Sequence, residues 1–500
     1  MSRSKSSLGD PKDHTDVRQG IIDTCIEMGR IGINQGTSGN VSARVPGGFL
    51  ITPSGIPYEK MTPEIVCFMD EEGRYYGVKL PSSEWRIHFD IYKVRPDANA
   101  IVHAHPTFST ALSVHQRTVP AFHSMVAAVG GTGIRCAKYA TFGSKDLSDN
   151  IIGAMSGGLK ACLMANHGIV AYGANMDKAL WLANLVECLS KQYVTASKLG
   201  PPTILSNEEM EVIVANKKAT EVEQGEFSVG DLRDHMEMRR ELINISIEME
   251  KMGISKGCSD NISTRIPGGM LITPAGIPLK RMEPDMIIFV DKDATLRDCK
   301  LPSSEWNIHQ DLYKARPDVN AIVSAQPTYA TALSSHRVAI PAFHYMIAVA
   351  GGKEIRCAKY ATLWSEEASE NILNAMSGGL RACLVPNHGI VACGDNLRRA
   401  VWLANEVECL SKQYVTACEL GPLSLLGNEE MDVILTKFKT YGKQPEEVAS
   451  MSLFEQEHAV VPPPRATHTK DADEGDGLKK PVNLEVLLKH YHWLLKRHSP

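Results

Sequence analysis

A short apolar segment with two histidines, Ala100–Pro106, is the most informative part of the hydrophobic pattern. Its β-branched Ile101 and Val102 predict a strand. Because alternate residues of a strand point to the same side, His103 and His105 present two imidazoles on one face. In this way a strand can offer two nitrogen ligands to one metal ion. Taken alone, the pattern is equally compatible with a solvated or hydrogen-bonded histidine pair.

The rest of the pattern alternates between helical and extended periodicity, which predicts an α/β fold. Apolar residues from Ile21 to Met28 have helical spacing, and Thr15 or Asp16 is a possible cap for this helix. Two further helices are predicted over Ser83–Val94 and over Met176–Leu199, the latter capped by Asn175. Short apolar runs predict strands at Phe49–Thr52, Ile65–Met69, Ala100–Ala104, Ala161–Met164 and Ile169–Tyr172.

The chain contains the same pattern twice, at a constant offset of 221 residues. Leu80–Trp85 recurs as Leu301–Trp306, and Asn166–Val170 recurs as Asn387–Val391. A period of this length indicates a duplicated domain rather than a solenoid. We expect a first copy at residues 14–222, a linker at 223–234 and a second copy at 235–444. Residues 1–13 and most of 445–500 are expected to be disordered, with one possible helix near the end of the chain.

Composition and charge narrow the class of protein. The 500 residues carry a formal net charge of −5 without a strongly basic stripe, which argues against nucleic-acid binding. No apolar run has membrane-spanning length and no secretory signal is present, so we expect a cytoplasmic protein without membrane association. The 12 cysteines are scattered through apolar segments, which favours buried thiols in a reducing compartment.

Polar residues in apolar surroundings accompany the two histidines on both sides in the sequence. Ser82-Ser83-Glu84 lies upstream and Asn166-His167-Gly168 lies downstream. Buried polar atoms need partners, so these segments are candidates for one site with His103 and His105. The Gly-rich turn Gly36–Asn40 could be an ordinary loop between a helix and a strand.

The first copy resembles the class II aldolase/adducin-head family. The matching stretches are Ile21–Asn40 (IIDTCIEMGRIGINQGTSGN), Ile51–Met61 (ITPSGIPYEKM), Leu80–Arg86 (LPSSEWR), Arg95–His105 (RPDANAIVHAH) and Tyr139–Gly143 (YATFG). The resemblance implies a central, largely antiparallel sheet flanked by helices. It also implies one Zn²⁺ per chain on three histidines, matched here by His103, His105 and His167. Three neutral imidazoles leave a coordination position open, as in catalytic zinc sites.

The same resemblance assigns roles to other polar residues. Glu84 matches the carboxylate that moves a proton at the carbon next to a ketone. Phosphate of the substrate would be held by small residues that offer backbone N–H groups and hydroxyls. They are matched by Thr37, Asn40, Ser54, Gly55, Ser82 and Ser83. Phe142 matches an aromatic wall at the aldehyde end of the substrate, and it could equally be a core residue.

The second copy departs from the family pattern at the metal site. Ser324 and Gln326 stand where the first copy has His103 and His105, so only His388 remains of the three histidines. One histidine with serine and glutamine is a poor zinc site. Asp260 in the second phosphate turn would place a negative charge beside a phosphate.

Two tyrosines of the family pattern are present in the second copy and absent from the first. In the resembling aldolases the site lies between neighbouring subunits of a fourfold ring, and the neighbour donates tyrosines. They fall at Tyr345 and Tyr441 in the second copy, where the first copy has Ser124 and Thr220. We therefore expect a homo-oligomer in which two chains form a ring of four domains, and in which second copies complete the sites of first copies. The sequence leaves open whether the donor belongs to the same chain, and independent decay of both copies into a scaffold is the alternative.

The leading interpretation is a zinc-dependent aldehyde lyase that cleaves a phosphorylated ketose to dihydroxyacetone phosphate and a short aldehyde. A sugar-phosphate dehydratase or epimerase on the same metal platform is a second hypothesis. A non-catalytic, adducin-like assembly module is a third. Adducin heads lack the metal histidines, which speaks against the third hypothesis for the first copy. The sequence does not determine the sugar, the native metal, the oligomer size or the role of residues 445–500.

Overall fold

A computed structural model describes residues 13–34, 38–222, 235–255, 260–274, 277, 281–293, 303, 305–362 and 365–438, without side chains for 217–222. The predicted linker and terminal segments therefore lie outside the described residues, apart from Asp13. The chain divides into two compact units. The first unit contains Met1–Val194 and Ile204–Val222, and the second contains Thr195–Thr203 and Glu223–Pro500.

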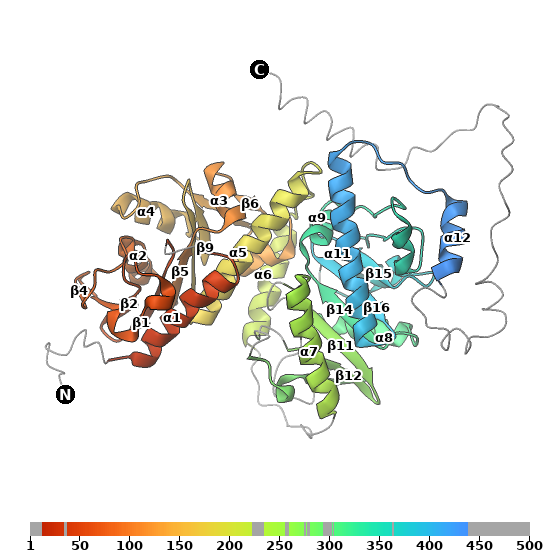
Figure 1. The fold of residues 1–500 in the computed structure, drawn as a ribbon, viewed down its shortest axis with the longest axis horizontal. Helices are drawn as coiled ribbons and strands as arrows, with labels where there is room; N and C mark the ends of the chain where they lie inside the picture. The colour runs from red at the N-terminus through yellow and green to blue at the C-terminus, as the bar shows by residue number, and fades with distance from the viewer. Residues whose placement is uncertain are drawn as a thin grey trace, which may run out of the picture. The chain divides into compact units, whose positions relative to one another are not determined.

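The first unit is built on an eight-stranded sheet with the order β4-β3-β2-β1-β5-β10-β9-β8 (Figure 1). The strands are β1 (Asn40–Val45), β2 (Gly48–Ile51), β3 (Cys67–Asp70), β4 (Tyr75–Tyr76), β5 (Ala100–Ala104), β8 (Cys136–Ala137), β9 (Ala161–Met164) and β10 (Gly168–Gly173). Neighbouring strands pair antiparallel, except for β8 and β9, which pair parallel. A separate short pair joins β6 (Val119–Pro120) to β7 (Gly133–Ile134).

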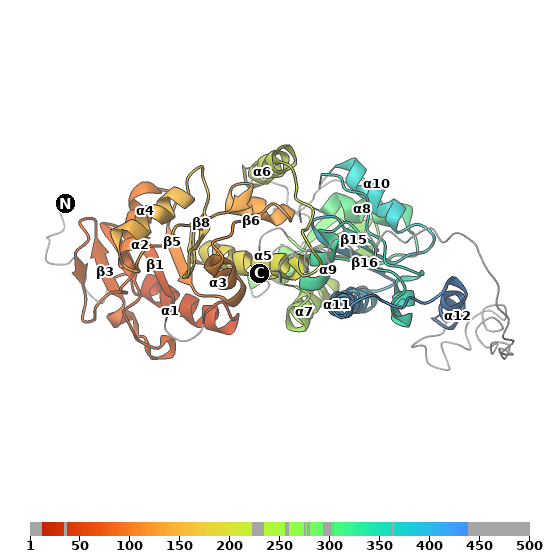
Figure 2. The same ribbon diagram turned by 90° about the horizontal axis from the view of Figure 1, so that it is seen from above.

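Helices cover both faces of this sheet. In Figure 2, α2 and α4 lie on one side of the strands, and α1 and α3 lie on the other. The helices are α1 (Thr15–Arg30), α2 (Trp85–Val94), α3 (Thr107–Val114), α4 (Lys145–Ala154), α5 (Met176–Ser197) and α6 (Asn207–Val222). Short 3₁₀ helices are η2 (Tyr58–Lys60), η3 (Pro63–Ile65) and η4 (Ser124–Val129). The central strand β5 is buried along its whole length, because helices pack on both of its faces.

The second unit repeats the central part of this arrangement with a six-stranded sheet of order β13-β12-β11-β14-β16-β15. Its strands are β11 (Asn261–Ile266), β12 (Gly269–Ile272), β13 (Ile288–Asp291), β14 (Ala321–Ala325), β15 (Ala382–Val385) and β16 (Gly389–Gly394). Its helices are α7 (Met236–Met252), α8 (Trp306–Ala315), α9 (Thr328–Ser334), α10 (Glu366–Ala375), α11 (Leu397–Glu419) and α12 (Asn428–Phe438), with the 3₁₀ helices η6 (Pro284–Met286) and η7 (Tyr345–Ala350).

Alternation along a central strand explains the three layers of the second unit. Val323 and Ala325 of β14 belong to a hydrophobic cluster with residues of α7 and α11, whereas Ile322 belongs to a second cluster with residues of α8 and α10. A strand with apolar residues on both faces is typical of a sheet that is covered on both sides. The predicted α/β fold, with a largely antiparallel sheet flanked by helices and present in two copies, is confirmed.

Several predicted elements differ from the structure at their ends. The helix predicted over Ser83–Val94 begins only at Trp85, because Ser82, Ser83 and Glu84 form the turn that leads into it. The cap predicted at Thr15 or Asp16 is wrong, since α1 begins at Thr15 and His14 occupies the N-cap position without a side-chain capping bond. Asn175 does cap α5, as its side-chain oxygen accepts a hydrogen bond from the Lys178 N–H.

Candidate metal centre

Three histidines of the first unit lie on or next to two neighbouring strands, β5 and β10. His103 lies on β5, and His105 follows directly after the end of this strand. His167 lies in the tight turn between β9 and β10, where Asn166 adopts a left-handed conformation with φ 56°. β10 pairs with β5 so that Val170 is opposite His103, which places the turn beside the two β5 histidines. The expected convergence of these three side chains is therefore present.

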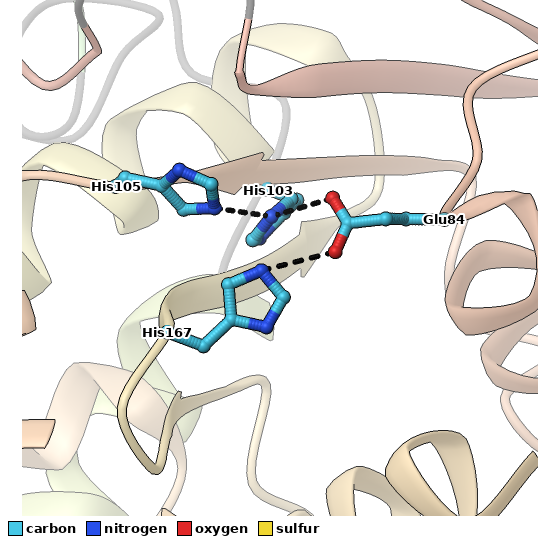
Figure 3. Close-up of side chains that lie close together, drawn as sticks. All are labelled: Glu84, His103, His105 and His167. Carbon is cyan, nitrogen blue, oxygen red and sulfur yellow. Dashed lines mark hydrogen bonds and ion pairs between the residues drawn. The ribbon is translucent and has the colours of Figure 1, made fainter. Parts of the chain in front are cut away.

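Glu84 completes the cluster from the turn before α2. One carboxylate oxygen lies 3.0 Å from His103 Nε2, and the other lies 3.0 Å from His167 Nε2. His105 Nε2 lies 2.9 Å from His103 Nε2. Figure 3 shows the four side chains pointing toward one another, and one ligand atom from each lies within 4.8 Å of the others.

The orientation of His103 is fixed by the sheet. Its ring is fully buried, and its Nδ1 lies 2.7 Å from the Ile169 carbonyl oxygen. A carbonyl can only accept, so Nδ1 carries the proton and donates it in this bond. Nε2 is therefore directed to the centre of the cluster, where it would offer its lone pair to a metal ion once it has lost its proton, which is the arrangement found in metal-binding histidines.

The charges of the cluster depend on close contacts between buried groups. Burial raises the pKa of Glu84, but the close contacts of its carboxylate with His103 and His167 outweigh burial and hold this pKa well below its usual range. Burial, together with repulsion from His103 and His167, lowers the pKa of His105 to about 3. His105 is thus neutral near pH 7, with a nitrogen lone pair available.

These residues fit a divalent metal ion. Three imidazole nitrogens and a carboxylate converge in a largely buried place, and two Nε2 atoms face each other at a distance that needs a shared proton or a cation. Within the described residues, Glu84 Oε1 has no hydrogen bond of acceptable geometry, although His167 Nε2 lies 3.0 Å away. Nitrogen ligands with one carboxylate are a donor set that zinc and similar ions accept.

A buried chain of hydrogen bonds leads away from Glu84, and the sequence analysis missed three of its members. Asn40 Nδ2 donates to Glu84 Oε2 at 3.0 Å, and Asn40 Oδ1 accepts from His88 Nε2. His88 Nδ1 is 2.7 Å from the Ser42 hydroxyl, which is 2.8 Å from the Tyr92 hydroxyl. Burial lowers the pKa of His88 to about 3, so this ring is neutral and its tautomer is set by Asn40.

The spacing of these residues in the sequence could have indicated that they belong to one hydrogen-bond network. His88 lies four residues after Glu84 and therefore on the same side of the helix start, whereas Asn40 and Ser42 are alternate residues of one strand. Polar residues with this spacing in apolar segments could have been grouped with Glu84.

The residues predicted to bind phosphate lie in two adjacent turns and in β1. Ser54 N–H donates to the Leu80 carbonyl and Ser82 N–H to the Thr52 carbonyl, which holds the Ser54-Gly55 turn beside Ser82 and Ser83. Ser54, Gly55 and Ser83 are exposed, and the Ser82 hydroxyl accepts from the Glu84 N–H at 3.3 Å. Asn40 is buried with its amide bonded as described above, and Thr37 lies outside the described residues.

Phe142 is 65% exposed, so the alternative of a core residue is wrong for this conformation. The next residue, Gly143, has φ 73°, and an added Cβ there would lie 2.9 Å from the Ser83 carbonyl oxygen. The loop that carries Phe142 therefore lies against the Ser82-Ser83 turn.

In the second unit, the carboxylates of Glu305 and Asp260 are bonded by neighbouring residues. The Ser324 hydroxyl donates to Glu305 Oε2 at 2.5 Å, and His388 Nε2 lies 2.7 Å from Glu305 Oε1. The Asp260 carboxylate accepts from the Gln326 N–H at 2.8 Å and from the Ser255 hydroxyl at 2.7 Å. Among the described residues, the Glu84 group is the one cluster of three or more possible metal ligands.

The two predicted donor tyrosines have different outcomes. Tyr345 opens η7 and is 48% exposed, with its ring 4.6 Å from His344 and 6.3 Å from Phe438. Ser124, at the equivalent place in the first unit, is buried. Tyr441 lies outside the described residues.

In the described part of the chain, no helix is both long and apolar enough to cross a membrane.

Comparisons with known proteins place both copies in one family. A family model described as "Class II Aldolase and Adducin N-terminal domain" matches residues 19–194 and 240–415. An L-fuculose phosphate aldolase of Escherichia coli O6:H1 is 51% identical over 199 residues, which are 40% of this chain and 92% of the relative. A 5-methylthioribulose-1-phosphate/5-deoxyribulose-1-phosphate aldolase of Escherichia coli O45:K1 is 46% identical over 199 residues, 40% of this chain and 93% of that protein. A solved L-fuculose 1-phosphate aldolase structure is 37% identical, covers 42% of this chain and 100% of its own, and has a TM-score of 0.41.

Proposed function

Because the chain belongs to the class II aldolase and adducin N-terminal domain family, we propose that its first copy is a zinc-dependent lyase for a phosphorylated ketose. The enzyme class is that of the metal-dependent aldolases, which are aldehyde lyases. The proposed substrate resembles L-fuculose 1-phosphate, and the products are dihydroxyacetone phosphate and a short aldehyde. The names of the related aldolases, which act on several ketose 1-phosphates, support this substrate class.

The observation that carries the proposal is the convergence of His103, His105 and His167 beside Glu84. The three imidazoles would hold the zinc ion. When bound, zinc supplies a Lewis acid that polarises a ketone and stabilises negative charge on its oxygen. The hydrogen bond from His103 to the Ile169 carbonyl keeps that ring oriented for this role.

Glu84 would move the proton at carbon. In the cleavage direction, the bond between the carbon next to the ketone and the aldehyde-side carbon breaks, and its electron pair stays on the ketone side. The aldehyde-side hydroxyl loses a proton and the ketone-side carbon gains one from Glu84, so the ionised carboxylate first takes up a proton and cleavage consumes none overall. A carboxylate in a buried site, held by Asn40, is suited to this transfer because its position is fixed relative to the substrate.

The phosphate would be bound by the two adjacent turns that carry Ser54, Gly55, Ser82 and Ser83, with Thr37 and Asn40 nearby in the sequence pattern. Ser54, Gly55 and Ser83 are exposed in these turns, and such small residues and hydroxyls are suited to an anion. Phe142, exposed on the loop beside Ser83, would form the wall at the aldehyde end.

Tyr345 and Tyr441 of a second copy would complete this site in a ring made by two chains. The exposed ring of Tyr345 supports this role, because a buried tyrosine could not reach a neighbouring site. Tyr345 would exchange a proton with the aldehyde-side oxygen. The hydrogen bonds and contacts that the Glu305 and Asp260 carboxylates make with neighbouring side chains and backbone support an assignment of one zinc per chain, in the first copy.

Elemental analysis and a cleavage assay together test the proposal. Purified protein should contain about one zinc per chain, and His167→Ala should lose it. Release of dihydroxyacetone phosphate from ketose 1-phosphates should disappear in His103→Ala and fall strongly in Tyr345→Phe. Metal-free protein that does not recover on addition of zinc would favour the adducin-like module, and two zinc ions per chain would contradict the assignment of the second copy.

A further inference from the structure

A side chain from another helix caps the start of α3, just after the histidine cluster. α3 begins at Thr107, and its N-cap residue Pro106 makes no side-chain capping bond. Glu187 of α5 takes over this role. Its carboxylate accepts hydrogen bonds from the backbone N–H groups of Phe108 and Ser109, both at 2.8 Å, and from the Ser109 hydroxyl at 2.7 Å. The first N–H groups of a helix have no acceptor within the helix, so this carboxylate fixes the start of α3 to α5.

His105, two residues before α3, has no comparable anchor for its own ring. His103 is oriented by the hydrogen bond from its Nδ1 to the Ile169 carbonyl. Among the described residues, the His105 ring has one hydrogen-bonding contact, and that contact is with His103, a proposed ligand of the same ion. On one side the ring lies against Gly168, where an added Cβ would be 2.7 Å from His105 Cδ2. The placement of this imidazole therefore depends on its backbone.

That backbone is held in different ways on its two sides. Before His105, β5 is paired along its length with β1 and β10. The His105 N–H lies 3.5 Å from Asn34 Oδ1, at the limit of a hydrogen bond. After His105, Pro106 has no N–H group, and its carbonyl accepts from the Thr110 N–H at 3.0 Å. The chain on this side is thus fixed by α3, and the start of α3 is fixed by Glu187.

From these contacts we infer that Glu187 is a positioning residue of the metal centre. It holds the start of α3 and, through Pro106, keeps the His105 imidazole where it converges with His103 and His167. Its hydrogen bonds go to α3 rather than to a histidine, so it acts through the backbone. The inference rests on the metal centre of the proposed function and adds a residue that supports one of its ligands.

Burial makes this link hard to replace with water. Ser109 is fully buried, and its hydroxyl lies 3.0 Å from the hydroxyl of Ser190, three residues after Glu187 on α5. Burial raises the pKa of Glu187, and the N–H groups that bond to the carboxylate oppose this shift. Without the carboxylate, the Ser109 N–H is left in a buried place without its acceptor, which favours movement of the start of α3.

The second copy separates the role in the fold from the role in metal binding. Glu408 occupies the equivalent position and accepts from the N–H groups of Tyr329 and Ala330 at 3.0 and 2.9 Å. The residue before this helix that corresponds to His105 is Gln326. The carboxylate therefore stabilises the start of a helix in both copies, but only in the first copy does that helix follow a proposed metal ligand.

The zinc affinity of the full chain tests the inference. Protein stripped of metal is titrated with zinc against a chromophoric chelator, which gives the dissociation constant of the zinc site. Glu187→Ala should raise this constant about tenfold or more, the loss that is typical when the support of a metal ligand is removed. Glu187→Gln keeps one acceptor oxygen and should raise the constant less. The visible absorption of the cobalt-loaded protein should change in Glu187→Ala, because a displaced His105 imidazole alters the set of ligands.

Two variants control for loss of stability. Glu408→Ala removes the equivalent cap from the second copy and should leave the zinc dissociation constant at its wild-type value. Ile151→Val shortens a fully buried side chain of α4, which lies on the opposite face of the first sheet from α3 (Figure 2). This variant should lower the unfolding temperature without a change in zinc affinity. Circular dichroism at the titration temperature establishes that each variant is folded before zinc is added.

Wild-type zinc affinity and an unchanged cobalt spectrum in folded Glu187→Ala would overturn the inference. An equal loss of zinc affinity in Ile151→Val would also overturn it, since the effect would then follow stability alone. If Glu187→Ala does not fold, Glu187→Gln decides the question, because a raised zinc dissociation constant supports the inference and an unchanged one contradicts it.

The same measurements distinguish this inference from the proposed function. A wild type that binds zinc tightly and has no lyase activity would contradict the proposed function alone. An active zinc enzyme in which Glu187→Ala binds zinc as the wild type does would contradict the inference alone. A wild type that takes up neither zinc nor cobalt would overturn both.

Discussion

Replacing His88 with phenylalanine removes the central member of the buried chain that holds Glu84. The histidine ring bonds on both sides, to Asn40 Oδ1 through Nε2 and to Ser42 through Nδ1. Phenylalanine fills a similar volume but offers neither bond. Asn40 Oδ1 would lose its donor in a place closed to water, and the Asn40 amide would no longer be held toward Glu84.

The size of the effect follows from these bonds. Leaving a buried acceptor without a partner costs about 1–3 kcal/mol. If the same amount is added to the activation free energy, because Glu84 is no longer held in its correct position in the transition state, kcat falls about 5- to 150-fold. KM should change less than kcat, because the exposed Ser54, Gly55 and Ser83 of the predicted phosphate site do not contact His88 and only Asn40 is shared with the buried chain.

The second copy provides a matched control. His309 is the equivalent buried histidine and bonds to Ser263 at 2.7 Å. Among the described residues, however, its Nε2 and Asn261 Oδ1 have no hydrogen-bond partner. His309→Phe should therefore leave kcat unchanged. A coupled assay for dihydroxyacetone phosphate gives kcat and KM for both variants, and elemental analysis establishes that each retains its metal.

A conservative variant separates positioning from simple packing. His88→Gln restores an N–H donor near Asn40 and should recover part of kcat. The reasoning is refuted if His88→Phe keeps wild-type kcat with its metal bound, or if His309→Phe lowers kcat by the same factor.

Two further predictions concern the site and its pH dependence. An added Cβ at Gly39 would lie 2.8 Å from the His103 carbonyl oxygen and 2.9 Å from the Asn34 side chain, so Gly39→Asp should destabilise the first copy by about 1–3 kcal/mol. The double variant Asn34→Ser/Gly39→Asp copies the Ser255–Asp260 pair of the second copy and should recover part of the lost thermal stability. An unfolding temperature as low as that of Gly39→Asp alone would contradict this account. Burial lowers the pKa of His88 to about 3 and of His309 to about 4, from 6.5, so the unfolded chain binds more protons between those values and 6.5. The free energy of unfolding should fall with falling pH in that window by up to about 1.4 kcal/mol per pH unit for each histidine, and urea titrations of His88→Phe and His309→Phe should show a shallower dependence.

Local periodicity was sufficient to predict the elements that carry the histidines. The strand expected at Ala100–Ala104 has those ends in the structure, because an apolar run with β-branched residues leaves few alternatives for a central strand. The constant offset between copies predicted the repetition of the sheet, since identical residues at identical spacing fold in the same way. The convergence of His103 and His167 needed the family resemblance, because residues far apart in the chain meet only through strand pairing.

The sequence could not show which hydrogen bonds the polar side chains of the two sites make. Asn40 was assigned to phosphate, a role that stays a prediction, while its amide bonds to Glu84 and His88 in the structure. Asp260 was expected to disfavour a phosphate, which stays a prediction, and in the structure its carboxylate accepts hydrogen bonds from the Ser255 hydroxyl and the Gln326 N–H. Both outcomes depend on the direction of short side chains in the folded chain, which residue spacing does not determine.

The two copies also show why residue identity alone is a poor guide to a functional site. The second copy retains the equivalents of Glu84, Asn40 and His88, yet Glu305 receives its hydrogen bonds from Ser324 and His388 at 2.5 and 2.7 Å. Its carboxylate is fully satisfied by protein, so a metal would have to displace existing bonds. In the first copy, Glu84 Oε1 lacks a bond of good geometry and the histidine nitrogens face one another, so a cation would relieve an unfavourable arrangement. Metal binding is therefore expected where polar groups converge without satisfying each other, and this condition distinguishes the first copy from the second.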